Sequence, residues 1–345
     1  MSKKEKNLAA SIPLKKAEKI RKKLFQKKLV KKNLKLIKDK NKLYIPLKKK
    51  IKTNSEFKIT EKKFPKKTKK IKDYKKIAKI PKKLKKFLPT SFDIIGTIIL
   101  IKIPEQLEKH KNKIGKALLK THPHIKTICN IKPVSGEFRT RNIEIIAGEQ
   151  KTTTTHKEYG IKIKLDIKKT YFSPRLSNER KRITQQVKKN ENILDMFTGV
   201  APFAIMIAKH SKPKKITAVD KNPNAIKYAQ KNIVQNHVAD KIKIYKKDAK
   251  KIPETINEKF DRIIMNLPFK SHKYIKHALK NTKKQATIHL YSILTEEETS
   301  KLIKKIEKKA KQKKYNIQNI NINKIKSYSP RQFYIGFDIT IQKKQ

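Results

Sequence analysis

Hydrophobic and polar positions alternate with two different periods in the second half of the chain, and the change of period predicts its strands and helices. Short apolar runs typical of buried strands are separated by stretches whose apolar residues recur every three or four positions, as in amphipathic helices. The predicted helices cover residues 176–189, 201–211, 223–237, 273–283 and 296–312, and the predicted strands cover 191–197, 214–220, 240–248, 260–267, 286–294 and 333–341, with one more strand before the last. Fully apolar strands that alternate with helices favour a mostly parallel sheet covered on both faces, in an α/β domain of residues 171–345.

The first half of the chain shows two other patterns. Residues 91–170 combine β-rich stretches with a helix at 111–122, which predicts a compact α+β domain. Residues 1–70 place short apolar clusters between runs of lysine, which predicts a small basic module. We interpret residues 71–90, where lysine dominates, as a linker.

Charge is the most unusual feature of the composition. The chain has 92 Lys and Arg against 28 Asp and Glu, for a formal net charge of +64. Such a chain favours a polyanionic partner, because lysines that neutralise phosphates release bound counterions. Nucleic acid is therefore the expected partner. The alternative is a compositional bias that uses Lys as a generic solvated surface residue.

Other counts restrict the class of protein. No apolar run reaches the roughly 18 residues needed to span a bilayer, and the lysine-dense N-terminus lacks the apolar segment of a signal peptide. The single cysteine, Cys129, excludes a disulfide framework and a zinc site built from thiolates. We therefore expect a soluble, cytoplasmic monomer that binds neither membrane nor metal.

Polar or glycine-bearing residues follow four of the predicted strands. They are Asp195 with the turn at Gly199, Asp220, Asp248 with Ala249, and Asn266 before Leu267 and Pro268. Ligands of parallel sheets bind at the carboxyl ends of the strands, where a glycine turn lets the backbone approach them. A carboxylate about 20 residues after such a turn is typical of a group that holds a ribose diol. Each residue taken alone is more often a turn or a helix cap than a ligand.

Together and in this order, these strand ends resemble the class I S-adenosylmethionine-dependent methyltransferases, whose Rossmann-like domain binds the cofactor across its first four strands. The resemblance implies that Asp195 and the Gly199 turn face the methionine end of the cofactor, Asp220 its ribose and Asp248 its adenine amine. Further cofactor contacts are implied for Phe197, Phe203, Lys221, Ala249, Asn266 and Pro268. A dinucleotide enzyme is disfavoured because the G-x-G-x-x-G pattern is absent.

Four stretches resemble a narrower family. GEFRTRNIEIIAGE (136–149), the segment from Thr155 to Ile183, DMFTGVAPF (195–203) and MNLPF (265–269) are similar to the archaeal and eukaryotic tRNA (guanine-N1)-methyltransferases that modify guanosine-37. The resemblance covers residues 91–345. That family also carries a small N-terminal tRNA-binding domain, which implies the same role for residues 1–70. One branch methylates carbon 7 of the wyosine precursor 4-demethylwyosine (imG-14) at the same nucleotide, and the sequence leaves this second activity open.

The same resemblance implies which residues act. The SPRLSNER motif places the family's catalytic carboxylate on Glu179, and the GEFR motif places its partnering arginine on Arg139. The remaining matches, around the target base and the cofactor, are Tyr171, Arg180, Asn266 and Pro268. Ala201 departs from the family, in which a second glycine usually stands before Pro-Phe. This departure adds only a methyl group, so we expect cofactor binding to survive.

Simpler explanations and other functions stay open at this point. A surface ion pair with Arg175, four residues earlier on the same predicted helix, would also explain Glu179, and a helix cap would explain Asn266. One alternative function is methylation of an exocyclic amine in RNA, which needs no carboxylate base. Another is RNA binding by a degenerate methyltransferase fold. A related enzyme that transfers the aminocarboxypropyl group of the cofactor is expected to lack the Asn-Leu-Pro signature.

Overall fold

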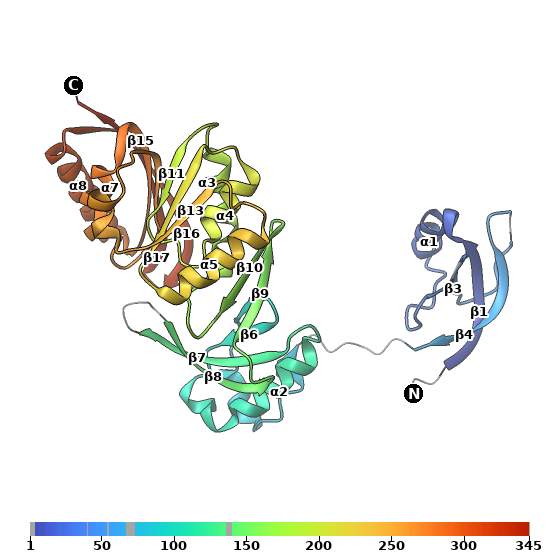
Figure 1. Ribbon diagram of the computed structural model, residues 1–345. Coiled ribbons are helices and arrows are strands. Elements are labelled where there is room, and N and C mark those ends of the chain that lie inside the picture. The colour runs from blue at the N-terminus through green and yellow to red at the C-terminus, as the bar shows by residue number, and fades with distance from the viewer. Residues whose placement is uncertain (1–3, 40, 54, 67–72, 136–139, 345) are drawn as a thin grey trace. The chain divides into compact units, whose positions relative to one another are not determined.

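The structure is a computed structural model that describes residues 4–39, 41–53, 55–66, 73–135 and 140–344 (Figure 1). It divides into two compact units, Met1–Lys72 and Asp73–Gln345, each of which is described by itself. None of the helices in the described part of the chain combines the length and apolar character that a bilayer-spanning helix needs.

The first unit is a small antiparallel sheet that packs against a helix. The sheet has the order β2-β3-β1-β4. The elements are β1 (Lys4–Pro13), α1 (Ala17–Gln26), β2 (Ile37–Lys38), β3 (Lys42–Pro46) and β4 (Lys58–Pro65). Ile20 and Leu24 of α1 are buried against Ile12 and Ile45 of the sheet. The basic N-terminal region therefore folds around an apolar core of its own.

The second unit begins with a four-stranded sheet of order β5-β6-β7-β8 covered by α2. The elements are β5 (Asp93–Ile95), β6 (Ile98–Ile101), α2 (Lys111–Thr121), β7 (Thr127–Ser135) and β8 (Thr140–Gly148). Tyr74, Ala78, Ile80 and Leu88 are buried in the core that this sheet forms with α2. Our interpretation of 71–90 as a linker is therefore wrong for the described residues from Asp73 on, because their apolar side chains belong to this core.

A β-hairpin follows and joins this sheet to the α/β domain. Its strands are β9 (Thr153–Glu158) and β10 (Ile161–Asp166). Ile161 and Leu165 are buried in one cluster with Phe203 of the α/β domain and Ile98 of β6. The hairpin, which we assigned to the α+β domain, is thus as much a part of the α/β core.

The α/β domain is built on a seven-stranded sheet of order β13-β12-β11-β14-β15-β17-β16. The first five strands in this order are parallel, and β17 is antiparallel to both β15 and β16. The strands are β11 (Asn192–Asp195), β12 (Lys215–Asp220), β13 (Ile242–Lys246), β14 (Phe260–Met265), β15 (Thr282–Leu294), β16 (Tyr315–Ser329) and β17 (Gln332–Lys343). The α/β class predicted from the periodicity is confirmed.

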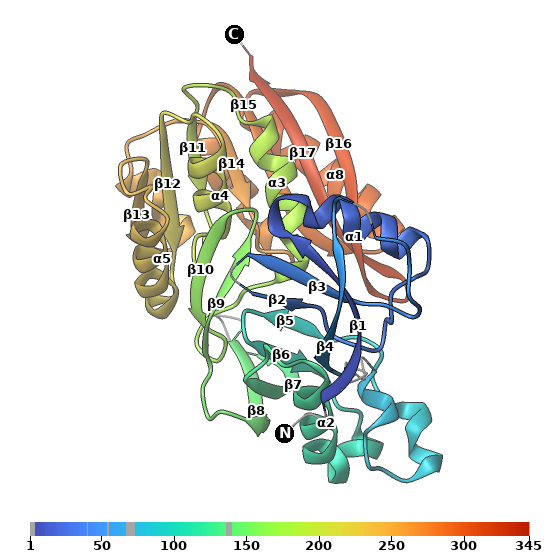
Figure 2. The same cartoon turned by 90° about the vertical axis from the view of Figure 1, so that its right-hand side faces the viewer.

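Helices cover both faces of this sheet (Figures 1 and 2). They are α3 (Ser177–Gln186), α4 (Pro202–His210), α5 (Pro223–Gln235), α6 (Ile252–Thr255), α7 (Ile275–Lys280) and α8 (Glu296–Gln312). Successive residues of one strand point to opposite faces. Ile193 accordingly packs in the cluster of α3, α4 and α5, and Leu194 packs in the cluster of α6, α7 and α8. This double burial explains why the strands are apolar throughout.

Candidate active site

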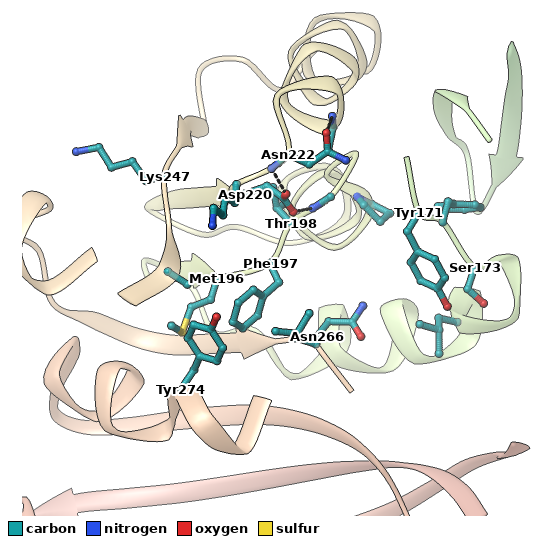
Figure 3. A pocket seen from close by; sticks show the side chains of 18 of the residues that line it. Tyr171, Ser173, Met196, Phe197, Thr198, Asp220, Asn222, Lys247, Asn266 and Tyr274 are labelled. Carbon is teal, nitrogen blue, oxygen red and sulfur yellow. Dashed lines mark hydrogen bonds between the residues drawn. The ribbon is translucent and has the colours of Figure 1, made fainter. Parts of the chain in front are cut away.

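A pocket lies where the parallel strands β11, β12, β13 and β14 end (Figure 3). Its wall is made by the loops after these strands and by the segment before α3. Nine of the residues proposed from the sequence line it, namely Tyr171, Arg180, Phe197, Gly199, Asp220, Lys221, Asp248, Ala249 and Asn266. The structure therefore brings together side chains that are nearly 100 residues apart in the sequence.

Five other candidates do not line the pocket. Asp195 is almost fully buried at the end of β11, and Pro268 lies just beyond the lining residue Leu267. Phe203, in the first turn of α4, is buried in the core of the domain. Glu179 is buried on α3. Arg139 lies outside the described residues.

The turn after β11 brings backbone to the pocket. Gly199 adopts a left-handed conformation with φ of 57°, which glycine accepts without strain. Ala201 is also left-handed, with φ of 65°, and Pro202 then begins α4. The alanine therefore stands where glycine would be the unstrained residue.

Asp220 is held at the pocket by backbone amides (Figure 3). Its Oδ2 accepts a hydrogen bond from the amide of Gly199 (2.7 Å), and its Oδ1 accepts one from the amide of Asn222 (2.9 Å). The amide of Lys221 is a third backbone donor, so a carboxylate with about four acceptor sites keeps one for a further donor. Burial raises the pKa of Asp220 despite these donors. A ligand with a hydroxyl donor, such as a ribose, suits this arrangement.

Asp195 has fewer hydrogen-bond partners than Asp220. Its Oδ2 accepts from the hydroxyl of Thr198 (2.8 Å), whereas its buried Oδ1 has no hydrogen-bond partner among the described residues. Burial, followed by the nearby charge of Asp220, raises the pKa of Asp195 to about 7. A donor or a positive charge supplied by a ligand would relieve both deficits.

Asp248 lines the pocket and caps the short helical turn that follows β13. Its Oδ1 accepts from the amide of Lys250 (2.9 Å), and its Oδ2 lies 3.8 Å from Nζ of Lys221. The residue is thus both a cap and a pocket-lining acceptor. The cap that we gave as the simpler explanation is confirmed at Asp248, and its role in cofactor binding stays a prediction.

Asn266 ends β14 at the pocket and does not cap a helix. Its Oδ1 accepts a hydrogen bond from the hydroxyl of Tyr334, and the following α7 begins only at Ile275. The carbonyl of Pro268 accepts from Ser292 Oγ (3.0 Å) and from the amide of Ile293 (3.2 Å). These bonds fix the Asn-Leu-Pro turn against β15.

Glu179 forms a buried ion pair, but not with the arginine that spacing alone suggested. Arg182 donates from Nε to Oε2 of Glu179 (2.8 Å) and from Nη2 to Oε1 (2.7 Å). The hydroxyl of Tyr291 donates to Oε1 as well (2.9 Å). Arg175 instead pairs with Asp93 of β5 (2.5 Å). The surface pair between Arg175 and Glu179 is therefore absent, and Glu179 retains one free acceptor site, on Oε2.

Two tyrosines connect Glu179 to Asn266. Tyr291 of β15 contacts Glu179 and Tyr334 of β17 contacts Asn266, while the centres of the two rings are 6.0 Å apart. Burial, and then the charge of Glu179, raises the pKa of Tyr291 well above its ordinary value, so the hydroxyl stays a donor. The two proposed catalytic groups thus stand at the ends of one aromatic bridge.

The pair of Glu179 and Arg182 continues into a chain of ionisable side chains, most of which are buried. Arg182 also binds Asp338 (2.5 Å), which is bonded to His289 (2.7 Å), and His289 contacts Arg262 (2.6 Å). Arg262 ends the chain in an ion pair with Glu191 (2.8 Å). We call these six residues, Glu179, Arg182, Asp338, His289, Arg262 and Glu191, the charge network.

The protonation of His289 follows from its two partners. Arg262 has only donors, so Nε2 of His289 must accept, and Nδ1 must carry the proton that it donates to Asp338. Burial lowers the pKa of His289, in keeping with this neutral form. Burial by itself would raise the pKa of Asp338, but the hydrogen bonds from His289 and Arg182 lower it well below its usual range.

Arg180 and Tyr171 also line the pocket. Arg180 is 1% exposed and forms a two-pronged ion pair with Glu158 of the hairpin (2.5 and 2.7 Å). The guanidinium of Arg141 lies 5.1 Å from the ring centre of Tyr171. Arg180 therefore helps to shape the pocket with its charge already neutralised by Glu158.

Sequence reasoning missed several lining residues, among them Phe172, Ser173, Thr198, Asn222, Lys247 and Tyr274. Asn222 carried a recognisable signal, because Asn before Pro is typical of a helix N-cap, and Asn222 does cap α5. Tyr274 carried none, since it packs edge-on against Phe197, 77 residues earlier. Among the described residues, no cluster of His, Cys, Asp and Glu has the arrangement of a metal site.

Comparison with known proteins places this geometry in a family. A model of the TRM5/TYW2 methyltransferase domain matches residues 154–318, a model of the TYW2 N-terminal domain matches 75–152, and a model of the tRNA methyltransferase 5 N-terminal domain matches 11–56. The tRNA (guanine(37)-N(1))-methyltransferase Trm5b of Pyrococcus abyssi is 36% identical to this chain over 336 residues, which cover 97% of this chain and 99% of the relative. The chain belongs to the TRM5/TYW2 methyltransferase family.

Two further relatives extend the comparison. The structure of the complex of aTrm5 and tRNALeu has a TM-score of 0.71 and 34% identity, and the match covers 98% of this chain and 100% of that one. The tRNA 4-demethylwyosine(37)-methyltransferase Taw21 of Saccharolobus solfataricus is 36% identical over 211 residues, 61% of this chain and 79% of the relative. The family resemblance inferred from the sequence motifs is confirmed.

Proposed function

We infer that this protein methylates N1 of guanosine-37 in tRNA, with S-adenosylmethionine as the methyl donor. The near-complete match to Trm5b supports the reaction. The single structural observation that best supports it is that the paired tyrosines Tyr291 and Tyr334 connect a buried carboxylate, Glu179, to a pocket-lining amide, Asn266.

The strand-end pocket fits the cofactor. Bound there, S-adenosylmethionine supplies an electrophilic methyl group on a positively charged sulfur. Asp195 lies directly before the lining residue Met196 in the sequence and has a buried oxygen without a partner among the described residues and a raised pKa, which suits a cationic ligand nearby. Asp220 offers an acceptor site to a ribose hydroxyl, and Asp248 offers one to an amine. Phe197 and Tyr274 add an aromatic wall.

Glu179 is proposed as the general base. Guanine N1 carries a proton at neutral pH, so it becomes a nucleophile only when a base removes that proton. The free acceptor site on Oε2 of Glu179 is available for it. A positioned base of this kind contributes about 10²–10⁴-fold to the rate. Arg182 and Tyr291 hold the carboxylate in one orientation and so contribute to alignment.

As N1 loses its proton, negative charge moves onto the carbonyl oxygen of guanine. The NH₂ group of Asn266 is a donor that this oxygen can use, because Tyr334 already occupies the amide oxygen. Arg139 is proposed as a second donor on the basis of the GEFR motif alone. Losing one preorganised donor of this type typically costs about 3 kcal/mol of transition-state stabilisation.

tRNA is the proposed partner. The net charge of +64 supports a phosphate-rich ligand, and a family member has been solved with tRNALeu. We propose that the basic first unit contributes to this binding, since residues 11–56 match the N-terminal domain of tRNA methyltransferase 5. The target base must leave the anticodon stack to reach the pocket.

The test is chemical analysis of the product. Unmodified tRNA transcripts with G37 and with A37 are incubated with the protein and S-adenosylmethionine, digested to nucleosides and analysed by chromatography with mass spectrometry. We expect 1-methylguanosine from the G37 transcript and no methylated nucleoside from the A37 control. An N²-methylated guanosine would support the exocyclic-amine alternative, and an aminocarboxypropyl adduct would overturn methyl transfer. Cofactor binding without any product would indicate a degenerate fold.

A second activity, carbon-7 methylation of 4-demethylwyosine at the same nucleotide, is supported by the match to Taw21. The same assay tests it with tRNA that carries this precursor at position 37. A gain of one methyl group on the tricyclic base is expected if the activity is present, and recovery of unchanged precursor would exclude it.

A further inference from the structure

Two exposed aromatic side chains touch each other beside the pocket. Phe269 is 46% exposed and Tyr328 is 53% exposed, and their ring centres are 5.7 Å apart in an edge-to-face arrangement. Large apolar side chains exposed as a contiguous pair often mark a binding surface. Nothing in the cofactor site or the charge network requires this pair.

The backbone holds Phe269 in its exposed position. The amide of Lys270 donates to the carbonyl of Leu267 (2.9 Å), which closes a tight turn with Phe269 inside it. The carbonyl of Pro268 is bound by Ser292 and Ile293. The ring is therefore presented by a rigid turn, and its exposure is not a result of a loose loop.

Tyr328 is exposed because of a β-bulge. The pairing of β16 with β17 shifts register between Ser327 and Ser329, whose partners are Phe333 and Gln332, and Tyr328 is the extra residue at this bulge. Bulges redirect a side chain and are common next to active sites. A tight turn and a β-bulge, which are separate features of the backbone, thus place the two rings against each other at one point on the surface.

That point is close to the proposed chemistry. Phe269 is three residues after Asn266, whose amide is bound to Tyr334, and Nζ of Lys326 lies 5.3 Å from the ring centre of Tyr334. Exposed Lys270 and Arg331 flank the aromatic pair in the sequence. Aromatic faces bordered by cationic side chains are the usual surface for an unstacked nucleobase and its phosphates.

We propose that Phe269 and Tyr328 form a stacking site for the nucleobase next to the target guanosine in the anticodon loop. The proposal rests on the proposed function, because extraction of the target base leaves its neighbour without a stacking partner. The aromatic pair replaces that partner and so stabilises the opened loop. The site does not read the identity of the base, since every base has a face that can stack.

The test uses single alanine variants of the full chain, Phe269→Ala and Tyr328→Ala. Ile322→Ala is the matched control, because Ile322 lies on the same strand as Tyr328 and is 49% exposed. Tyr328→Phe is the conservative variant that retains the ring. Two readouts are the KM for tRNA with kcat, and the fluorescence of transcripts with 2-aminopurine on either side of the target nucleotide.

We expect each alanine variant to raise the KM for tRNA by about 5- to 150-fold, the range of a lost base-aromatic stack. Affinity for S-adenosylmethionine should stay unchanged. Stacking should quench 2-aminopurine at one flanking position with the wild-type protein, Tyr328→Phe and Ile322→Ala, and the quenching should be lost in both alanine variants. Unchanged KM, or quenching that persists without the rings, would overturn the proposal.

The two proposals fail in different ways. If the wild-type protein quenches the probe but transfers no methyl group to N1, the proposed function fails and the stacking site stands. If 1-methylguanosine forms while neither flanking position is quenched, the stacking site fails and the proposed function stands.

Discussion

Asp195 and Asp338 are both buried carboxylates of the same sheet, one at the end of β11 and the other within β17, yet their surroundings are opposite. Asp195 has an oxygen without a partner among the described residues, and burial raises its pKa to about 7. Asp338 is bonded to Arg182, His289 and Gln186, and these donors outweigh burial and lower its pKa. The two carboxylates therefore differ in whether the described residues supply all of their hydrogen-bond and charge partners.

The difference indicates two roles. Asp195, beside the pocket, lacks a compensating cation among the described residues, so it needs a donor or a positive charge from a ligand. The charge network satisfies its own members, so it needs no ligand and serves to hold Glu179 in place. Buried ion pairs are costly to break, which makes such a network rigid. The proposed base is therefore held in place by its own partners, whereas Asp195 beside the pocket is left electrostatically unsatisfied.

Replacing the base should have the largest effect. Glu179→Gln is expected to lower the single-turnover rate of methyl transfer by about 10²–10⁴-fold, because the amide cannot take the N1 proton. Calorimetry should show unchanged affinity for S-adenosylmethionine. Tyr291→Phe is the matched control: it removes one hydrogen bond to Glu179, worth about 1 kcal/mol, and keeps the carboxylate. An unchanged rate in Glu179→Gln would rule out the general base.

Removing the unsatisfied charge should reveal its energetic cost. Asp195 keeps its proton in the folded protein up to about pH 7, whereas in the unfolded chain it ionises near 3.8. Since the folded state binds the proton more tightly, wild-type stability should fall as pH rises between these values. Relative to Asp195→Asn, the fall should total about 4 kcal/mol, measured by urea unfolding from pH 4 to pH 8.

The same Asp195→Asn variant should bind S-adenosylmethionine more weakly at pH 8, because it has lost the charge that attracts the cationic cofactor. A variant that is more stable but binds less cofactor is the expected combination. Parallel stability curves for the two proteins would contradict the assignment of an uncompensated acid at this position.

Removing the charge of Asp338 should destabilise the fold, because its hydrogen-bonded partners then lose a buried carboxylate. Asp338→Asn is expected to cost about 3 kcal/mol, the lower end for a broken buried pair, because Arg182 retains Glu179. Denaturant unfolding measures this loss. Glu297→Gln, which breaks an exposed pair with Lys301 on α8, is the control and should have a much smaller effect. Equal effects of the two substitutions would show that the network adds no stability.

The smallest effect on stability is expected at Ala201, which has the left-handed conformation that suits glycine. Ala201→Gly relieves a left-handed alanine but loses a buried methyl group and adds freedom to the unfolded chain. These terms nearly cancel, so the free energy of unfolding should change by less than about 1 kcal/mol. Cofactor affinity, measured by calorimetry, should stay the same. A large gain in affinity would mean that the alanine distorts the pocket.

The strand-end residues could be predicted because their signal is local. An apolar run followed by Asp or Asn marks the end of a buried strand, and the order of the strands then brings Asp220, Asp248 and Asn266 to one edge. Phe203 shows the limit of this reasoning. It lies in a motif next to the pocket, but its helical position directs the ring towards Tyr291 in the core.

The surroundings of Glu179 could not be predicted in the same way. Tyr291 bonds to Glu179, and Asp338 bonds to Arg182. Both partners come from the paired strands β15 and β17, more than 100 residues later in the chain. Spacing along one helix suggested Arg175 as the partner instead. Local pattern identifies which side chains matter here, whereas the long-range register of the sheet decides what they contact.

The most direct test is a crystal structure of this protein with S-adenosylhomocysteine and unmodified tRNA. If a fixed base and a pocket-lining amide share one guanine, an oxygen of Glu179 should lie about 2.6–3.2 Å from N1 of guanosine-37. The amide of Asn266 should lie within hydrogen-bond reach of the carbonyl oxygen of the same base. A guanine bound with N1 facing away from Glu179, and the carboxylate still closed by Arg182 and Tyr291, would contradict the account.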